Sequence, residues 1–221
     1  MHVRKQFAII GLGRFGGSLA KTLARLGAEV LAVDIDCEKV RAIAPVVTEA
    51  VEADGTSEAV LSELGVKNFD VVIVAMSGFE ASLLVTLYLK QLGVKQVVVK
   101  AASDVHGKIL ESVGADTVVF PEKDMGQRLA YSLVSGSVID YIELSEEYGV
   151  IEIVVKEALV GRTLRNLNLR NKMGLNIVAI KRRNHVNIYI NPDEPLQEGD
   201  VMVAIGPNDG VKHLNDILER G

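Results

Sequence analysis

Cysteine is nearly absent from this sequence of 221 residues, in which Cys37 is the only one. A single thiol excludes an internal disulfide and a cysteine metal cluster, and it fits a reducing compartment. Nothing in the sequence around Cys37 assigns it a role.

Long apolar runs are absent as well. The run VVIVAM at 71–76 has the length of a buried strand, whereas a bilayer-spanning helix needs about 20 apolar residues. Residues 1–13 are basic and then apolar, as in a signal peptide, but the apolar part is short and a glycine loop interrupts it. We therefore expect a protein that is not integral to a membrane, with the start of the chain forming the first strand.

Basic residues are fewer than acidic ones, 24 against 29. The net charge of −5 argues against nucleic acid as a main partner, because the protein surface as a whole repels phosphate. A nucleotide would have to be held by a local site. The composition, 48% hydrophobic and 24% charged, is typical of a globular protein with a sizeable core, and the length suits two domains.

Short apolar runs and longer amphipathic segments alternate from residue 6 to about 135. Short β-branched runs separated by helix-length segments are typical of βαβ units and of a parallel sheet buried on both faces. This order predicts an α/β, Rossmann-like, doubly wound sheet. The expected strands are 7–10, 30–33, 50–53, 71–75, 96–100 and 117–120.

Glycines mark the expected helix ends in this region. Gly27, Gly65, Gly93 and Gly114 each stand between a helical segment and the following strand. The residue after a helix often needs a positive φ, which glycine adopts without strain. We expect this backbone conformation at all four positions.

The pattern changes after about residue 137. Strands, turns and short helices there predict a small α+β domain, so we expect an N-terminal domain at 1–137 and a C-terminal domain at 138–221. The expected C-terminal elements are strands with a turn at 141–155, a short helix at 163–174, a hairpin at 175–190, a strand at 199–206 and a final helix at 208–219.

Residues 9–20, IIGLGRFGGSLA, place three glycines between the first strand and the first helix. In such a turn Gly11 permits the bend, Gly13 lets the backbone approach a phosphate, and Gly16 lets the helix pack against the strand. The helix N-terminus presents free amides to an anion. The context predicts an adenosine nucleotide site; a Rossmann scaffold with an empty loop is the alternative.

Asp34 ends the second expected strand, about 20 residues after the loop. A carboxylate there can accept hydrogen bonds from both ribose hydroxyls and would repel a 2′-phosphate, so we expect NADPH to be disfavoured.

Arg14 lies inside the glycine pattern. A cation in the first turn of a helix opposes the helix dipole unless an anion lies beside it. Arg14 therefore either extends into solvent or contacts the terminal phosphates of ADP or ATP.

A dehydrogenase would need a proton donor beside its cofactor. The expected N-terminal domain contains only two histidines, His2 and His106. No segment of the sequence has the pattern expected of a lid that closes over a substrate. His106 could act as a general acid, contact a phosphate or ribose, or end a helix in solvent. The sequence offers no partner for catalysis.

Glu122 lies in PEKDMG, which follows the sixth expected strand at the edge of the sheet where ligands bind. Pro121 followed by acidic residues is an ordinary helix start. A carboxylate near phosphates would instead need a divalent cation such as Mg²⁺ or Ca²⁺ between them. Both interpretations of Glu122 stay open.

Several segments together resemble the cytosolic regulatory subunits of Ktr/Trk-type bacterial potassium uptake systems. The resemblance rests chiefly on GLGRFG at 11–16, EVLAVDID at 29–36, PEKDMG at 121–126 and LQEGDVMVAIG at 196–206. Such subunits consist of an RCK (regulator of potassium conductance) nucleotide-binding domain followed by a small RCK C-terminal domain.

The resemblance implies a non-enzymatic gating ring on the cytoplasmic face of a membrane potassium-translocating subunit, so the protein would be cytoplasmic and peripheral to the cell membrane. Family subunits form homodimers that assemble into an octamer. ATP favours the active ring and ADP the inactive one. The main alternative is an NAD(H)-binding sensor on the same fold, and a small NAD-dependent oxidoreductase is a further one.

The resemblance also implies a set of nucleotide-binding residues. They comprise the phosphate loop, the ribose segment, later strand ends around the adenosine, the exit of the fifth strand, and a cation and γ-phosphate position at the dimer interface, Glu122. The expected set is Gly11, Gly13, Arg14, Gly16, Asp34, Ile35, Asp36, Asp54, Gly55, Ala75, Met76, Ser77, Lys100, Ala101, His106 and Glu122.

The C-terminal domain of Ktr subunits is similar to a sensor for cyclic di-AMP, bound between two copies. The resemblance places Arg170 at a phosphate, Asn176 and Ile177 opposite a base, and Pro192 as an apolar wall. Arg170 would equally suit a solvated helix and Asn176 a turn.

Overall fold

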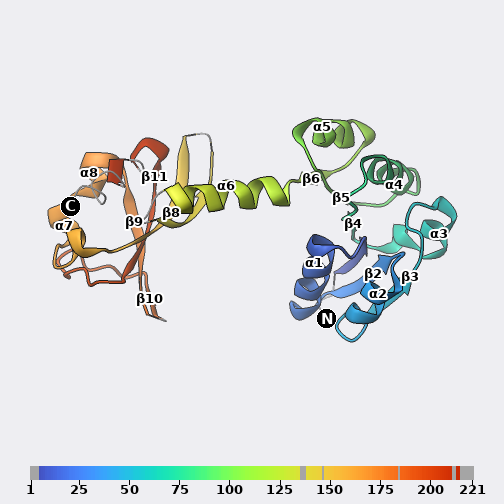
Figure 1. Cartoon of the computed structure of the whole chain (residues 1–221), viewed down its shortest axis with the longest axis horizontal. Coiled ribbons are helices and arrows are strands. Elements are labelled where there is room, and N and C mark those ends of the chain that lie inside the picture. Colours follow the sequence, from blue (N-terminus) through green and yellow to red (C-terminus); the bar gives the residue numbers. More distant parts are fainter. Residues whose placement is uncertain (1–4, 135–137, 146, 184, 211–212, 215–221) are drawn as a thin grey trace. The chain divides into compact units, whose positions relative to one another are not determined.

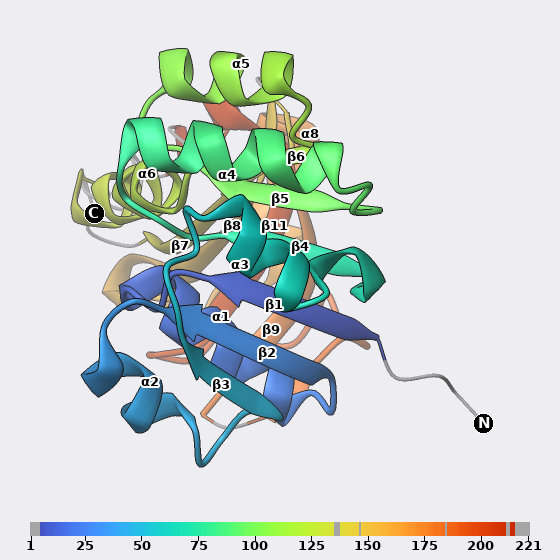
Figure 2. The same cartoon turned by 90° about the vertical axis from the view of Figure 1, so that its right-hand side faces the viewer.

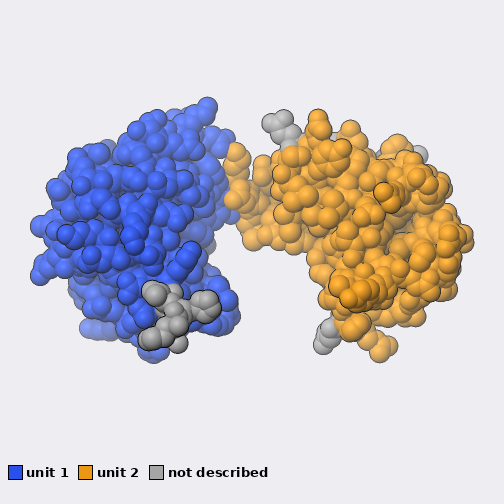
Figure 3. Space-filling model, turned by 180° about the vertical axis from the view of Figure 1, so that it is seen from behind, with its two compact units in different colours: residues 1–122 blue, residues 123–221 orange. Residues whose placement is uncertain are grey.

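The computed structural model divides the chain into two compact units, Met1–Glu122 (unit 1) and Lys123–Gly221 (unit 2), which Figure 3 shows in different colours. The division at 137 and 138 expected from the sequence stays a prediction. The structure describes residues 5–134, 138–145, 147–183, 185–210 and 213–214.

Unit 1, which carries the labels α1 to α5 in Figure 1, contains a six-stranded parallel sheet in the order β3-β2-β1-β4-β5-β6. Figure 2 faces this unit and shows β3, β2, β1, β4 and β5 following one another across the sheet. The order reverses beside β1, as in a doubly wound sheet, and the Rossmann-like prediction is confirmed. The strands are β1 (Gln6–Ile10), β2 (Glu29–Asp34), β3 (Glu49–Glu52), β4 (Val71–Val74), β5 (Val97–Lys100) and β6 (Thr117–Val119).

Helices cover both faces of this sheet. One core packs the sheet against Leu61, Leu89 and Leu110 of α3, α4 and α5, and the other packs it against Ala20 of α1 and Ile43 of α2. Burial on both faces explains why the central strands are continuous apolar runs. The helices are α1 (Arg14–Arg25), α2 (Cys37–Ile43), α3 (Glu58–Glu63), α4 (Phe79–Gln91) and α5 (Asp104–Val113), with a 3₁₀ turn, η1 (Val66–Asn68).

The glycines between helices and strands have the expected backbone conformation. Gly27, Gly65, Gly93 and Gly114 have φ values of 85°, 66°, 79° and 109°. The prediction of four positive-φ helix ends is confirmed.

Helix α6 (Pro121–Val134) begins at the proline predicted to start it. Its Arg128 donates two hydrogen bonds to the carboxylate of Asp140, and the ring of Tyr131 lies 4.2 Å from the ring of Tyr141. These contacts attach the second half of α6 to the first strand of unit 2.

Unit 2 contains an antiparallel sheet in the order β10-β9-β11-β8-β7. Its core includes the fully buried side chains of Ile151, Ile153, Leu175 and Met202. The small α+β prediction is confirmed. The strands are β7 (Val138–Glu143), β8 (Tyr148–Val154), β9 (Asn176–Arg182), β10 (His185–Asn187) and β11 (Val201–Pro207), with a 3₁₀ turn, η2 (Glu157–Leu159).

The helix expected at 163–174 is two short helices, α7 (Leu164–Leu167) and α8 (Leu169–Met173). They are separated by Asn168, whose φ of 48° is left-handed and ends the first helix. Of the final helix expected at 208–219, residues 208–210 and 213–214 are helical, and the remainder lies outside the described residues.

Among the described residues, no helix combines the length and the apolar character needed to cross a bilayer.

Candidate functional site

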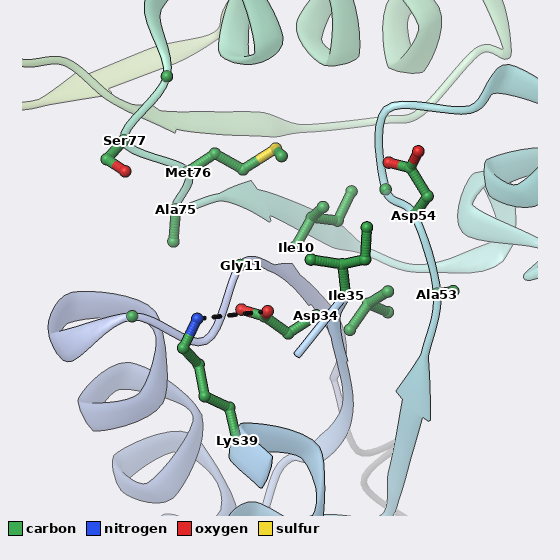
Figure 4. Close-up of a pocket in the computed structure, with 14 residues that line it drawn as sticks. Ile10, Gly11, Asp34, Ile35, Lys39, Ala53, Asp54, Ala75, Met76 and Ser77 are labelled. Carbon is green, nitrogen blue, oxygen red and sulfur yellow. Dashed lines mark hydrogen bonds and ion pairs between the residues drawn. The ribbon is translucent and has the colours of Figure 1, made fainter. Parts of the chain in front are cut away.

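The carboxyl ends of β1, β2, β3 and β4 surround a cavity of about 270 Å³ in unit 1 (Figure 4), which we call the first cavity. In Figure 4 Ala75 and Met76 lie across this cavity from Asp34 and Lys39. This is the edge of a doubly wound sheet at which ligands bind. The lining residues are Ile10, Gly11, Gly13, Val33, Asp34, Ile35, Lys39, Ala53, Asp54, Gly55, Ala75, Met76, Ser77 and Gly78.

The glycine loop has the geometry expected of it. Gly11 has a φ of 97°, and a Cβ there would lie 3.1 Å from the carbonyl carbon of Ala75. A Cβ on Gly16 would lie 2.0 Å from the carbonyl oxygen of Gly11, so only glycine lets α1 pack this closely on the loop. Gly11 and Gly16 therefore shape the loop.

Gly13 differs from the other two glycines. It is exposed, has an extended backbone at the N-cap of α1, and a Cβ built on it would meet nothing within 4 Å. No side chain caps the helix there and its first turn holds no acidic residue. The free amides of α1 are therefore open to an anion from the side of the cavity.

Asp34 is 9% exposed at the end of β2. Its Oδ2 accepts a hydrogen bond from Leu12 N at 2.6 Å, and its Oδ1 accepts one from Asp36 N at 2.9 Å. Burial would raise the pKa of the Asp34 carboxyl, but these hydrogen bonds and the charge of Lys39 outweigh it and hold the pKa below its ordinary value. The group is an anion at neutral pH.

Lys39 is a lining residue that the sequence reasoning did not single out. Its Nζ lies 3.4 Å from Asp34 Oδ1 and 3.5 Å from Asp36 Oδ2. It is the third residue of α2, and helical side chains tilt towards the N-terminus, which directs it back to Asp34. The sequence signal that could have identified Lys39 is its position in the first turn of a helix, where a cation opposes the helix dipole unless an anion lies nearby. The same signal singled out Arg14.

Asp54 and Gly55 follow β3 on the opposite side of the cavity. Asp54 accepts hydrogen bonds from the hydroxyl and the backbone N–H of Thr56, which lower the pKa of its carboxyl. A Cβ on Gly55 would lie 2.4 Å from Cγ2 of Ile10, so the chain passes close to β1 at this point.

A second cavity, of about 230 Å³, shares Met76 and Ser77 with the first. Lys100 Nζ, at the end of β5, lies 2.7 Å from Oε1 of Glu122 in the first turn of α6. The hydrogen bond from Lys100 holds the pKa of Glu122 below its ordinary value. The lining residues are Met76, Ser77, Lys100, Ala102, His106 and Glu122.

His106 is 2% exposed, and its hydrogen bonds fix its protonation. Nδ1 accepts from Ala102 N at 3.2 Å, so in the neutral ring Nε2 carries the proton and donates to Ser82 Oγ at 2.9 Å. The Ser82 hydroxyl donates in turn to the carbonyl of Phe79. Burial lowers the pKa of His106, which therefore lines the cavity as a neutral, fully bonded ring rather than as a general acid.

The structure brings most of the predicted nucleotide residues to these two cavities, but four do not line either one. Gly16 lies beneath the loop, Ala101 is buried, and Asp36 caps α2 by accepting from Glu38 N. Arg14 is exposed at the start of α1, and within the described part of the chain no side chain pairs with it.

No cluster of three or more His, Cys, Asp or Glu side chains that could hold a metal ion occurs among the described residues. A cation at Glu122 would take its remaining ligands from water, from a nucleotide or from another chain.

In unit 2, one cavity of about 540 Å³ brings together all four residues predicted to bind cyclic di-AMP, Arg170, Asn176, Ile177 and Pro192. Arg170 extends from α8, Asn176 and Ile177 begin β9, and Pro192 follows β10. Arg165 also lines the cavity, and its guanidinium donates two hydrogen bonds to the carboxylate of Asp193. The cavity therefore combines apolar walls with one cation that has no described partner, Arg170.

Comparison with known proteins decides the family. Residues 7–121 match the TrkA-N domain, and residues 150–219 match the TrkA-C domain. The Ktr system potassium uptake protein C of Bacillus subtilis is 49% identical over 205 residues, which cover 92% of this chain and 93% of the relative. The chain belongs to the Ktr potassium uptake protein family. Ktr system potassium uptake protein A of the same organism is 45% identical over 213 residues, 96% of each chain.

Membership in the Ktr family confirms the resemblance seen in the sequence and the prediction of a regulatory protein rather than an enzyme. Among solved structures, the GsuK channel bound to NAD matches with a TM-score of 0.68 and 19% identity, over 98% of this chain and 40% of the channel chain. At this identity the likeness establishes the fold of this Ktr protein, whose chain spans less than half of that channel.

Proposed function

We propose that this Ktr protein is a cytosolic subunit that senses ADP and ATP and thereby gates a membrane potassium-translocating subunit. One observation carries the proposal: the open amides at Gly13 and the buried carboxylate of Asp34 face the same cavity in a member of a potassium uptake family. In an adenosine nucleotide site, free amides at a helix N-terminus bind the phosphates and a carboxylate at the end of the second strand binds the ribose.

The proposed nucleotide places its ribose at Asp34 and its first phosphates at Gly13. Because the two cavities share Met76 and Ser77, a longer phosphate chain extends towards Lys100. ADP and ATP can shift a conformational equilibrium only through different affinities for its two states. The γ-phosphate must therefore contact a group that ADP does not reach, and Arg14 and Glu122 are the two candidates.

Glu122 is proposed to bind the γ-phosphate through Mg²⁺ or Ca²⁺ at a homodimer interface. The carboxylate is 67% exposed and can exchange Lys100 for another cation. Hard divalent ions take carboxylate and phosphate oxygens together.

NAD(H) is the second candidate ligand. The observation that favours it is the pair of adjoining cavities, which offers room for a second nucleoside beyond the pyrophosphate. Asp34 suits the adenosine ribose of either ligand.

Calorimetric titration of the full chain with ATP, ADP and NADH, each with and without Mg²⁺, tests these proposals. We expect micromolar binding of ATP and ADP, with Mg²⁺ strengthening ATP alone. Tight binding of NADH without measurable binding of ATP would refute the ADP/ATP sensor in favour of an NAD(H) sensor. Binding of none of the three ligands would refute the nucleotide site altogether.

Unit 2 is proposed to bind cyclic di-AMP in its cavity, with Arg170 contacting a phosphate. Replacing Arg170 with alanine should abolish binding of cyclic di-AMP to the full chain. Lys172→Ala is the matched control, because this exposed cation lies on the same helix and does not line the cavity. Unchanged affinity in Arg170→Ala, or no heat with the unaltered chain, would refute the assignment.

Assembly is proposed to proceed through homodimers to an octameric ring on the inner face of the membrane. Exposed apolar side chains on α6 support contact between copies: Met125, Leu129 and Leu133 recur every four residues and are 58%, 56% and 74% exposed. Light scattering gives the mass of the purified chain, and a monomer at micromolar concentration would contradict the proposed ring.

A further inference from the structure

Lys39 introduces a positive charge at the ribose end of the first cavity. The Lys39 ammonium lines the cavity and contacts the carboxylate of Asp34 (Figure 4). It also lies 3.5 Å from Asp36 Oδ2, and the Lys39 side chain is 44% exposed. The side chain can therefore move without unpacking a core.

The carboxylate of Asp34 has few acceptor positions left for a ribose. Its two oxygens offer about four, and Leu12 N, Asp36 N and Lys39 Nζ occupy three of them. A ribose that donates from both hydroxyls needs two acceptors. The second hydroxyl is accepted only if Lys39 leaves Oδ1, so ribose binding and the position of Lys39 are coupled.

Asp34 and Lys39 have opposite effects on which substituent the site prefers at the ribose 2′ carbon. An acid at the end of the second strand binds an unmodified ribose and repels a 2′-phosphate, whereas a basic residue close by attracts that phosphate. Here the two kinds of group lie 3.4 Å apart. Discrimination at the ribose 2′ carbon therefore depends on both, and not on Asp34 alone as the sequence suggested.

We propose that Lys39 is a specificity-determining residue of the nucleotide site: its ammonium turns from Asp34 to the substituent on the ribose 2′ carbon, so that the cavity accepts a 2′-phosphate as well as a hydroxyl. This inference rests on the proposed adenosine nucleotide site. The competing explanation is that Lys39 only neutralises the buried carboxylate of Asp34 and never touches ligand.

The test compares 5′-AMP with adenosine 2′,5′-bisphosphate, which differ only in the 2′-phosphate, with ADP as a reference. Calorimetry on the full chain measures each Kd at one ionic strength. The variants are Lys39→Met, which keeps the apolar stem, and Lys39→Arg, which keeps the charge. Lys95→Met is the control, because Lys95 forms a comparable ion pair with Asp70 in unit 1 and lines neither cavity.

For the unaltered chain we expect the two ligands to bind within about tenfold of each other, because a charge-assisted contact from Lys39 offsets the repulsion by Asp34. Lys39→Met should raise the ratio of the bisphosphate Kd to the AMP Kd about tenfold, and Lys39→Arg and Lys95→Met should leave it unchanged. Thermal unfolding without ligand verifies that each variant is folded.

An equal loss of affinity for both ligands in Lys39→Met, or no loss for either, overturns the inference in favour of the neutralising role. It is also overturned if the unaltered chain binds 5′-AMP and ADP but not the bisphosphate. If the unaltered chain binds none of the three nucleotides, the proposed nucleotide function fails, and the two failures are thus distinguishable.

Discussion

The ammonium of Lys100 lies 2.7 Å from the carboxylate of Glu122 and joins the end of β5 to the first turn of α6. The Lys100 side chain is 13% exposed and that of Glu122 is 67% exposed. Lys100 is thus confined beside the second cavity, whereas Glu122 is free to change partners. Any anion that enters this cavity competes with Glu122 for Lys100.

Glu122→Gln should therefore alter how ATP binding depends on divalent ions. The substitution removes one negative charge near the proposed phosphates and frees the charge of Lys100. We expect ATP affinity without Mg²⁺ to rise about threefold to tenfold and the strengthening by Mg²⁺ to disappear. Titration calorimetry measures both, with Glu111→Gln on α5 as control. If neither quantity changes, Glu122 is only part of a helix start.

Arg14→Ala should weaken ATP more than ADP, by about tenfold in the ratio of their Kd values, because a charge-assisted contact to the terminal phosphate is lost. Arg25→Ala, at the other end of α1, serves as control for a lost cation on the same helix. Equal losses for the two nucleotides would make Arg14 a general phosphate contact.

Gly13→Ala and Gly16→Ala should have different effects: we expect the first to weaken nucleotide binding and the second to destabilise the fold. A Cβ on Gly16 would overlap the carbonyl oxygen of Gly11, so we expect a loss of about 2 kcal/mol or more in the free energy of unfolding. A Cβ on Gly13 meets no protein atom and would project where the phosphate approaches. Gly13→Ala should keep its thermal unfolding midpoint and lose nucleotide affinity; a stable variant with full affinity would show that no phosphate approaches this backbone.

Asp200 should make the stability of unit 2 depend on pH. It is 1% exposed and accepts two hydrogen bonds of 2.8 Å from Arg182, which are the main reason that its pKa is lowered. Its stabilising effect is therefore complete above the ordinary Asp pKa of about 4 and is lost as pH falls through the lowered value.

We expect Asp200→Asn to lower the free energy of unfolding by about 2 kcal/mol at pH 7, because it weakens the charge-assisted hydrogen bonds that the buried carboxylate accepts from Arg182. The loss should shrink as the pH is lowered below about 4, where the unaltered chain loses the same interaction. Urea unfolding at several pH values measures this. Glu194→Gln, which alters the more exposed partner of Arg182, should have a smaller effect; an equal effect would argue against the role of burial.

Local patterns predicted most of unit 1 because the signals are short-range. The β-branched runs and the glycines at 27, 65, 93 and 114 each act on their own segment, so the positions of the strands and the ends of the helices could be foreseen. In unit 2 the break at Asn168 was missed, because a left-handed asparagine has no sequence signal as strong as that of glycine.

By itself the sequence determined the Rossmann-like sheet, the glycine loop and the acid at Asp34, because each depends on backbone requirements that few residue types satisfy. Only the tertiary structure decided that Lys39 faces Asp34, that Lys100 holds Glu122, and that His106 is neutral. Long, flexible side chains take their partners from whatever the folded sheet edge brings within reach, and that arrangement arises from the packing of strands and helices distant in sequence.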